Sequence, residues 1–208
     1  MNKCIGIISY LPDDENKRKI REKKIVSLLS DCDKYLDLPI IIIAQNWKDF
    51  NVDCCQLYRY DKPLGIVGAR KELRKKFLES GYDYLIMLDD DCVISGTKEG
   101  FDKYLSEIDN HPGMYGKFKG TLLKLFAISK EIFALQDFGD GRVENGDFFE
   151  DILFVNTLDK KYPDKQFTFS QCVKEQSNNY NDENSTWYHG QYNKHEIGDR
   201  TRALLKEI

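Results

Sequence analysis

Short, uniformly apolar runs divide the first half of the chain. The clearest of them lie at residues 3–9, 38–44 and 84–88. They are too short and too uniformly apolar for amphipathic helices, so they predict strands that are buried on both faces of a parallel sheet. Residues 54–60 predict a further, shorter strand.

The longer segments between these runs carry apolar residues at helical spacing. Helices are expected at 15–36, after the acidic cap residues Asp13 and Asp14, and at 66–79. The Lys and Arg residues of the first helix are expected mostly on its outer face. Its apolar face consists of Ile20, Ile25, Leu28, Leu29 and Leu36. Strand and helix thus alternate, which is typical of an α/β domain with a central, mostly parallel sheet flanked by helices.

The second half of the chain shows weaker and more varied patterns. They predict helices at 98–108, 130–135 and 147–158, strands at 122–128 and 167–172, and a loop or hairpin at 111–120. The polar, Asn-rich residues 176–185 are expected to be mobile without a ligand, and a short basic helix is expected at 200–207.

Composition narrows the class of protein. A chain of 208 residues with 41% hydrophobic and 32% charged residues is long enough for one well-cored domain. No apolar run approaches the ~20 residues of a membrane span, and the N-terminal residues lack the layout of a secretory signal, so a cytoplasmic location is expected. A net charge of −4 argues against a general nucleic-acid binder. The six cysteines form no CxxC pair, so neither a disulfide nor a zinc site is expected.

The strongest chemical signal follows the run at 84–88, where Asp89, Asp90 and Asp91 are consecutive. Open α/β sheets bind ligands at the carboxyl ends of their strands. Adjacent carboxylates repel one another, so a divalent cation that prefers oxygen ligands is expected among them. Alternation along an extended backbone turns Asp89 and Asp91 to one side and Asp90 to the other. The alternative is an acidic turn that only solvates a strand end.

Four features, in this order, resemble the glycosyltransferases of the GT-A fold, a single-domain, Rossmann-like α/β architecture that uses nucleotide-sugar donors. They are the strand at 4–9, the helix start Gly65-Ile66-Val67-Gly68-Ala69-Arg70, the sequence Leu88-Asp89-Asp90-Asp91, and Phe149-Glu150-Asp151. The resemblance spans residues 3–170. It implies one domain at 1–208, with a nucleotide-binding half at 1–95, an acceptor half at 96–175, and a C-terminal lid and tail at 176–208.

The resemblance also implies roles for the residues near the triple aspartate. Asp91 would bind Mn²⁺ or Mg²⁺, which stabilises the charge on a diphosphate leaving group. Asp89 would hold the ribose of the donor or share the metal through water, and Asp90 would turn toward the donor sugar or the backbone. Arg70 would contact the nucleotide or a phosphate, although a solvated charge on the helix surface is the alternative.

The remaining donor contacts are expected from strand ends and the C-terminal segment. Ser9 and Tyr10 would line the nucleotide pocket. An aspartate is expected after the second strand to read the base, but the chain has Gln45; an amide also pairs with uracil, and a UDP-sugar is the expected donor. By resemblance, His189 would complete the metal site, with His195 as the competing ligand, and Lys194 would meet the diphosphate.

Glu150 and Asp151 are the candidate catalytic pair. An acceptor hydroxyl needs a base to remove its proton, and the resemblance assigns this role to Asp151, which makes the transfer inverting. The alternative is that both residues only favour the positive end of a helix.

Candidate acceptors are a saccharide, a hydroxymethylated base in DNA, or a peptide side chain. A nucleotidyltransferase and a non-catalytic nucleotide- or metal-binding module remain the competing functions. A nucleotidyltransferase ordinarily has a glycine-rich phosphate loop after the first strand, and residues 9–13 lack one.

Overall fold

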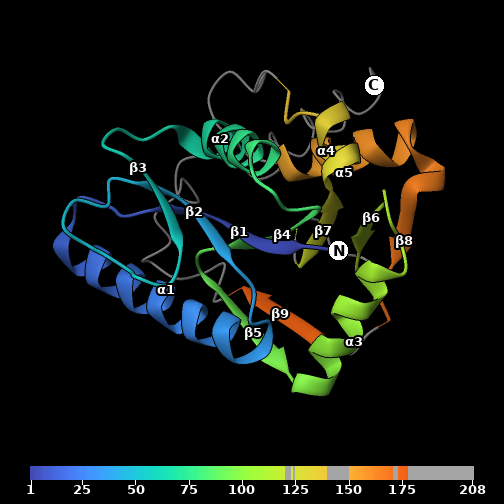
Figure 1. Ribbon diagram of the computed structural model, residues 1–208. Helices are drawn as coiled ribbons and strands as arrows, with labels where there is room; N and C mark the ends of the chain where they lie inside the picture. The colour runs from blue at the N-terminus through green and yellow to red at the C-terminus, as the bar shows by residue number, and fades with distance from the viewer. Residues whose placement is uncertain (120–122, 124, 140–149, 171–172, 178–208) are drawn as a thin grey trace, which may run out of the picture.

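A seven-stranded sheet forms the centre of the protein (Figure 1). The computed structural model describes residues 1–119, 123, 125–139, 150–170 and 173–177. In spatial order the strands are β3 (Gln56–Tyr60), β2 (Ile40–Gln45), β1 (Lys3–Tyr10), β4 (Tyr84–Asp89), β7 (Phe126–Ser129), β6 (Tyr115–Lys117) and β8 (Gln166–Thr168). Only β7 runs against its neighbours, so the predicted mostly parallel sheet is confirmed.

Alternating side chains of the central strands enter two separate cores. Ile5 and Ile7 of β1 point into one core, whereas Cys4 and Ile8 point into the other. All six residues of β2 are buried. A strand with both faces covered must be apolar at every position, which is why the runs at 3–9, 38–44 and 84–88 lack the polar alternation of a half-exposed strand.

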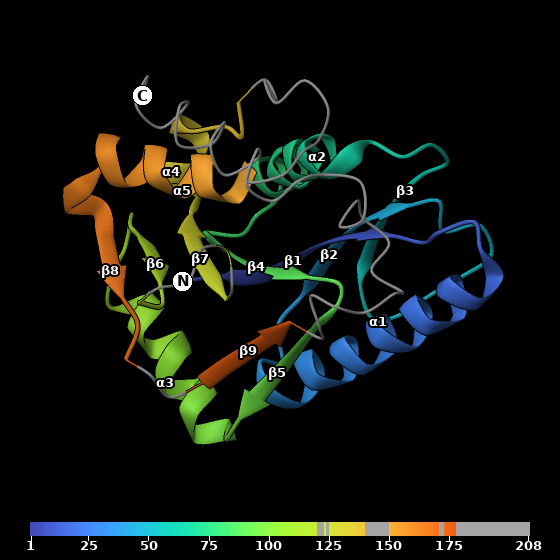
Figure 2. The ribbon, with the colours of Figure 1, turned by 180° about the vertical axis from the view of Figure 1, so that it is seen from behind.

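Helices cover both faces of the sheet, as Figures 1 and 2 show from opposite sides. On one face, α1 (Glu15–Tyr35) and α3 (Lys98–Asp109) pack over the first core. On the other face, α2 (Gly65–Glu79), α4 (Lys130–Leu135) and α5 (Glu150–Lys161) pack over the second core. No helix in the described residues is long and apolar enough to cross a membrane.

Helix α1 begins where the sequence predicts. The carboxylate of Asp14 accepts a hydrogen bond of 2.9 Å from the backbone N–H of Lys17, which satisfies one of the free amides of the first turn. One basic residue departs from the expected outer face, because Arg21 is only 6% exposed. The guanidinium of Arg21 lies beside the Asp90 carboxylate, just after β4, rather than in solvent.

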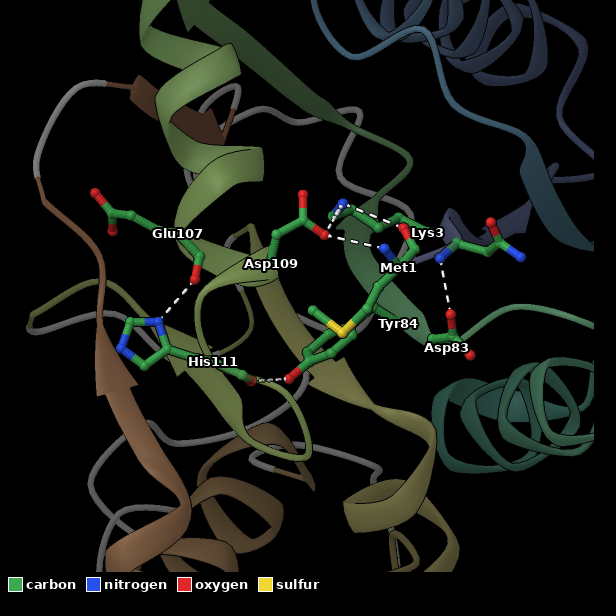
Figure 3. A network of polar contacts seen from close by, with 8 residues as sticks. Met1, Lys3, Asp83, Tyr84, Glu107, Asp109 and His111 are labelled. Atoms are coloured by element: carbon green, nitrogen blue, oxygen red, sulfur yellow. Dashed lines mark hydrogen bonds and ion pairs between the residues drawn. The ribbon is translucent and has the colours of Figure 1, made fainter.

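A polar network anchors the opposite end of the sheet, where β1 and β4 begin (Figure 3). Asp109, at the end of α3, lies 2.6 Å from the ammonium of the buried Lys3 and 3.3 Å from the amino group of Met1. The Tyr84 hydroxyl donates to the backbone carbonyl of His111, and the His111 ring donates through Nδ1 to the Glu107 carbonyl at 2.7 Å. Helix α3 is therefore joined to the starts of both central strands.

The sequence did not predict the second, two-stranded sheet. Here β5 (Cys92–Gly96) pairs antiparallel with β9 (Val173–Ser177), and in both views this small sheet lies between α1 and α3. The expected strand at 167–172 is wrong as one unit, because β8 ends at Thr168 and β9 starts at Val173. Gln176, predicted to be mobile, belongs to β9; residues 178–185 lie outside the described part. Short strands with distant partners leave little local signal.

Smaller differences concern the ends of elements in the second half. Strand β7 begins at Phe126 rather than at 122, and α5 begins at Glu150, whereas residues 147–149 lie outside the described part. Strand β6 occupies part of the segment 111–120, which was expected to be a loop or hairpin. The expected helix at 200–207 also lies outside the described residues.

A tight contact at Gly116 supplies a test of this packing. A Cβ atom at Gly116 would lie 2.6 Å from a ring atom of Phe167 and 2.6 Å from a ring atom of Phe169. We expect Gly116→Ala to lower the free energy of unfolding by about 1–3 kcal/mol, because two packed rings would have to move. Chemical denaturation measures the change. Gly81→Ala is the matched control, since no described atom lies within 4 Å of its Cβ position. Equal stability of the two variants would contradict the packing.

Candidate functional site

The residues that the sequence singled out meet at the carboxyl ends of the parallel strands. Strand pairing places Ile8 beside Asp89 and Tyr10 beside Gln45, so the ends of β1, β2 and β4 form one edge. The loop after β1 leads into α1, and α2 brings Arg70 to the same edge. This edge is where open α/β sheets bind their ligands.

Asp90 lies inside the protein and is held from two sides. Its Oδ1 accepts a hydrogen bond of 2.8 Å from Arg21 Nη1, and its Oδ2 accepts one of 2.6 Å from the Ser9 hydroxyl. The indole N–H of Trp47 donates in turn to Ser9 Oγ at 3.1 Å. Burial raises the pKa of Asp90 above its ordinary value, and the positive charge of Arg21 opposes this shift. The structure thus gives Asp90 internal partners on β1 and α1 rather than a face toward a donor sugar.

Asp89 and Asp91 point outward on either side of Asp90. Their side chains are 44% and 32% exposed, compared with 12% for Asp90. Oδ1 of Asp89 lies 3.1 Å from Arg70 Nη2, and Oδ2 of Asp91 lies 3.5 Å from Arg21 Nη1. The alternation predicted for an extended backbone is wrong, because β4 ends at Asp89 and the next two residues form a turn. Arg21 of α1 contacts both Asp90 and Asp91, whereas Asp89 pairs with Arg70 of α2.

Arg70 is a component of the site rather than a solvated charge of its helix. It is only 5% exposed, and its guanidinium carbon lies 5.8 Å from the ring centre of Phe138. The alternative of a solvated helix charge is wrong because the ion pair with Asp89 directs Arg70 to the strand ends. An arginine fork at this position has the geometry to bind phosphate or carboxylate oxygens.

Ser9 and Gln45 lie at the predicted edge, but their side chains bond within the protein. Gln45 Oε1 accepts a hydrogen bond of 2.7 Å from the backbone N–H of Leu64, just before α2, and Gln45 Nε2 lies 3.5 Å from the Ser9 carbonyl. Gln45 therefore joins β1 to the start of α2. Tyr10 is half-buried at the end of β1. Donor contacts by Ser9, Tyr10 and Gln45 stay predictions.

The amide of Asn46 shapes the loop that follows β1. Asn46 has φ +58°, in the left-handed region that asparagine tolerates better than most residues. Its Nδ2 donates to the Leu11 carbonyl at 2.8 Å and to Asp13 Oδ1 at 3.0 Å. Where an aspartate was expected after the second strand, the chain has Gln45 and Asn46. The side-chain amide of Asn46 holds the loop after β1 in place.

The candidate catalytic pair occupies the first described positions of helix α5 (Glu150–Lys161), and Asp151 is half-buried. Phe154, one turn further along α5, stacks on Phe138 with ring centres 4.1 Å apart. Residues three apart share a helix face, so Asp151 lies on the face of α5 that packs toward Phe138. The catalytic role of the pair stays a prediction.

The donor atoms at the site fit a hard divalent cation in part. Asp89 and Asp91 offer exposed carboxylate oxygens, the ligand type of Mn²⁺ and Mg²⁺ bound to a diphosphate. Within the described ranges, no group of three or more His, Cys, Asp or Glu residues is arranged to hold a metal ion. His189, Lys194 and the competing His195 lie outside the described residues.

Sequence reasoning missed Arg21 and Trp47. A signal for Arg21 was present, because it is spaced four and seven residues before Ile25 and Leu28 and so lies on the apolar face of α1. A charge on an otherwise apolar helix face implies a buried partner. Trp47 gave no such signal, since its partner Ser9 is distant in the sequence.

Comparisons with known proteins agree with this description of the fold. No protein-family model matches the sequence, and no curated protein matches it. Among solved structures, S. aureus TarS 1–349 in complex with UDP-GlcNAc is similar at a TM-score of 0.58 and 13% identity, over 90% of this chain and 62% of TarS 1–349. This chain therefore spans less than two thirds of that protein.

Two further solved structures cover more of their own length. A putative nucleotide-diphospho-sugar transferase from Desulfovibrio desulfuricans G20 has a TM-score of 0.53 and 14% identity, over 81% of this chain and 80% of that one. A cytidylyltransferase from Leptospira borgpetersenii has a TM-score of 0.51 and 11% identity, over 83% and 77%. This chain thus shares its α/β fold with TarS, with the nucleotide-diphospho-sugar transferase and with the cytidylyltransferase, and the GT-A-like fold expected from the resemblance is confirmed.

The structural role of Gln45 is testable. We expect Gln45→Ala to lower the free energy of unfolding by about 1–2 kcal/mol, because the Leu64 amide would lose its acceptor at the start of α2. Urea denaturation measures the change. Gln56→Ala, which removes one long hydrogen bond of 3.5 Å to Tyr82 on the edge strand, serves as the control and should change stability by less than about 0.5 kcal/mol. If Gln45→Ala is equally neutral, Gln45 does not join these elements.

Proposed function

We propose that the protein is a glycosyltransferase that moves a sugar from a nucleotide-sugar donor to an acceptor hydroxyl. One observation carries the proposal: two outward carboxylates, Asp89 and Asp91, lie at the strand ends of a GT-A-like fold. A buried arginine contacts each of them. This combination suits a ligand that brings both a cation and negative phosphates to the sheet edge.

The donor would lie along this edge with its diphosphate toward the aspartates. Asp91, assisted by Asp89, would hold Mn²⁺ or Mg²⁺, and the bound cation would neutralise charge on the leaving diphosphate. Arg70 would donate from the N–H groups of its guanidinium to a phosphate or to the nucleotide. A UDP-sugar is the proposed donor, supported by the similarity to TarS, whose structures contain UDP and UDP-GlcNAc.

Asp151 is the proposed catalytic base. A continuous row of contacts supports this role: Asp89 pairs with Arg70, Arg70 faces the Phe138 ring, and Phe138 stacks on Phe154 of α5. Because Asp151 shares its helix face with Phe154, its carboxylate would be directed toward the side of the molecule that carries the donor edge. A base on the face opposite the leaving group produces one displacement, so the transfer would invert the anomeric centre.

The acceptor would bind in the half of the domain at 96–175, with the donor in the half at 1–95. We propose a saccharide or a hydroxymethylated DNA base as the acceptor, with a peptide side chain as the third class.

The test of the acceptor is incubation of the protein with UDP-GlcNAc, UDP-glucose or UDP-galactose and Mn²⁺, followed by mass spectrometry of oligosaccharides, modified DNA and proteins. A mass increase of one sugar in one class identifies the acceptor; no increase in any class contradicts the transfer.

A nucleotidyltransferase is the second candidate, because a cytidylyltransferase has a similar structure. The loop after β1 argues against it. Leu11 is fully buried, and its backbone N–H donates to the Gln45 carbonyl at 3.1 Å, so this amide is not available to cradle a triphosphate. Release of pyrophosphate from UTP or CTP and a sugar phosphate would favour this alternative. A protein that binds UDP but turns over neither class of substrate would be a binding module.

Asp91→Asn tests the metal site. We expect this variant to lose at least tenfold in affinity for UDP in the presence of Mn²⁺, because a neutral amide is a weaker ligand for a hard cation. Isothermal calorimetry with and without Mn²⁺ gives the affinity. Asp102→Asn, an exposed carboxylate paired with Lys98 on α3, is the matched control and should bind like the unaltered protein. Unchanged Mn²⁺-dependent affinity in Asp91→Asn would remove Asp91 from the metal site.

Asp151→Asn tests the base. We expect transfer to fall by roughly a hundredfold or more, the usual scale for loss of a general base, with an almost unchanged dissociation constant for the donor. Glu150→Gln should lose less, because neighbouring helix positions diverge by about 100° and only one of them faces the acceptor. Turnover and donor binding are measured on the same preparations. A larger loss in Glu150→Gln would make Glu150 the base, and full turnover in both variants would exclude the helix start.

A further inference from the structure

We propose that Arg21 is a positioning residue of the donor site, shared between the buried Asp90 and the outward Asp91. The inference rests on the proposed function, because it concerns how Asp91 is held for a cation and a diphosphate. Nη1 of Arg21 lies 2.8 Å from Asp90 Oδ1 and 3.5 Å from Asp91 Oδ2. A single nitrogen thus contacts two adjacent carboxylates, one buried and the other partly exposed.

The shorter contact serves as the anchor. Asp90 is fixed by Arg21 from α1 and by Ser9 from β1, and Ser9 is itself held by Trp47. Because Asp90 lies in the turn directly after β4, fixing its side chain limits where Asp89 at the strand end and Asp91 in the same turn can lie. The network therefore sets the direction of both outward carboxylates before any ligand arrives, as site preorganisation requires.

The longer contact acts on Asp91 itself. At 3.5 Å the guanidinium attracts the Asp91 carboxylate without enclosing it, and 32% of that side chain stays exposed. Arg70 has the same relation to Asp89, at 3.1 Å and 44% exposure. The structure thus places one buried arginine behind each outward carboxylate. These two positive charges offset the mutual repulsion of three consecutive aspartates when no cation is bound.

Stability alone gives no reason for this arrangement. Arg21 is spaced like a core residue of α1, in line with the buried Ile25 and Leu28. Buried ion pairs are often no more stabilising than well-packed apolar residues of similar volume, because both charges lose their hydration. An apolar residue at 21 and a neutral one at 90 would complete the core equally well. The ion pair is explained if it serves to orient the Asp91 carboxylate.

The test combines single and double substitutions. Arg21→Met should lower the melting temperature by about 10 °C, since it leaves Asp90 buried without its cation. Arg21→Met/Asp90→Asn removes both buried charges, so most of this loss should be recovered. If Arg21 also positions Asp91, the double variant should still bind UDP with Mn²⁺ at least tenfold more weakly than Asp90→Asn alone. Lys19→Met, which removes an exposed charge of the same helix, is the control for both measurements.

The outcomes separate this inference from the function on which it rests. If the double variant binds UDP and Mn²⁺ as tightly as Asp90→Asn, Arg21 is only a structural partner of Asp90 and the inference is overturned. If Asp91→Asn binds UDP and Mn²⁺ as tightly as the unaltered protein does, Asp91 is not a metal ligand and the proposed metal site is overturned. If the unaltered protein binds no UDP with Mn²⁺, both proposals are overturned. Melting temperatures of the ligand-free variants are measured in every case, so folding defects are distinguished from binding defects.

Discussion

The ion pair between Arg21 and Asp90 is the constraint on which the sheet edge depends. It joins α1 to the end of β4, and Ser9 extends it to β1. A buried charge without a partner is costly, so this contact requires the helix, the two central strands and the loop that carries Trp47 to keep one arrangement. The positions of Asp89 and Asp91 follow from that arrangement, because the two residues flank the anchored carboxylate on the same strand end.

The sheet gives this anchor a rigid base. Its central strands are buried on both faces by separate helical layers, and α3 is bound to their opposite ends through Lys3 and Asp109. The site lies at the other end, where the strands stop and the backbone no longer has sheet partners. Polar side chains replace the sheet contacts there: Gln45 joins the start of α2, and Asn46 holds the loop after β1. The fold thus separates an apolar core from an edge that is held by polar side chains.

Much of the fold was predictable because its signal is local. Strands β1, β2 and β4 are continuous apolar runs. Asp14 predicts the start of α1 correctly, because it is the residue that caps the helix. Strands β5 and β9 escaped prediction because each is stabilised by the other, across a long stretch of chain. The candidate site was likewise predictable only where its signal is local. The run of three aspartates located the site, but strand alternation did not describe it, because Asp90 and Asp91 lie in a turn and both contact Arg21. Arg21 is 69 residues away from Asp90, so their pairing could not be predicted from local sequence.

The most direct measurement of the central claim is phosphorus NMR of a UDP-sugar incubated with the protein, diamagnetic Mg²⁺ and a panel of acceptors. The account predicts that the sugar-linked diphosphate signals of one donor disappear and are replaced by those of free UDP, in proportion to the glycosylated acceptor formed. Free UDP identifies cleavage between the sugar and the diphosphate, which is the bond that a glycosyltransferase breaks. Conversion to UMP and a sugar phosphate, or no conversion of any donor in the presence of Mg²⁺ and acceptor, would contradict the account.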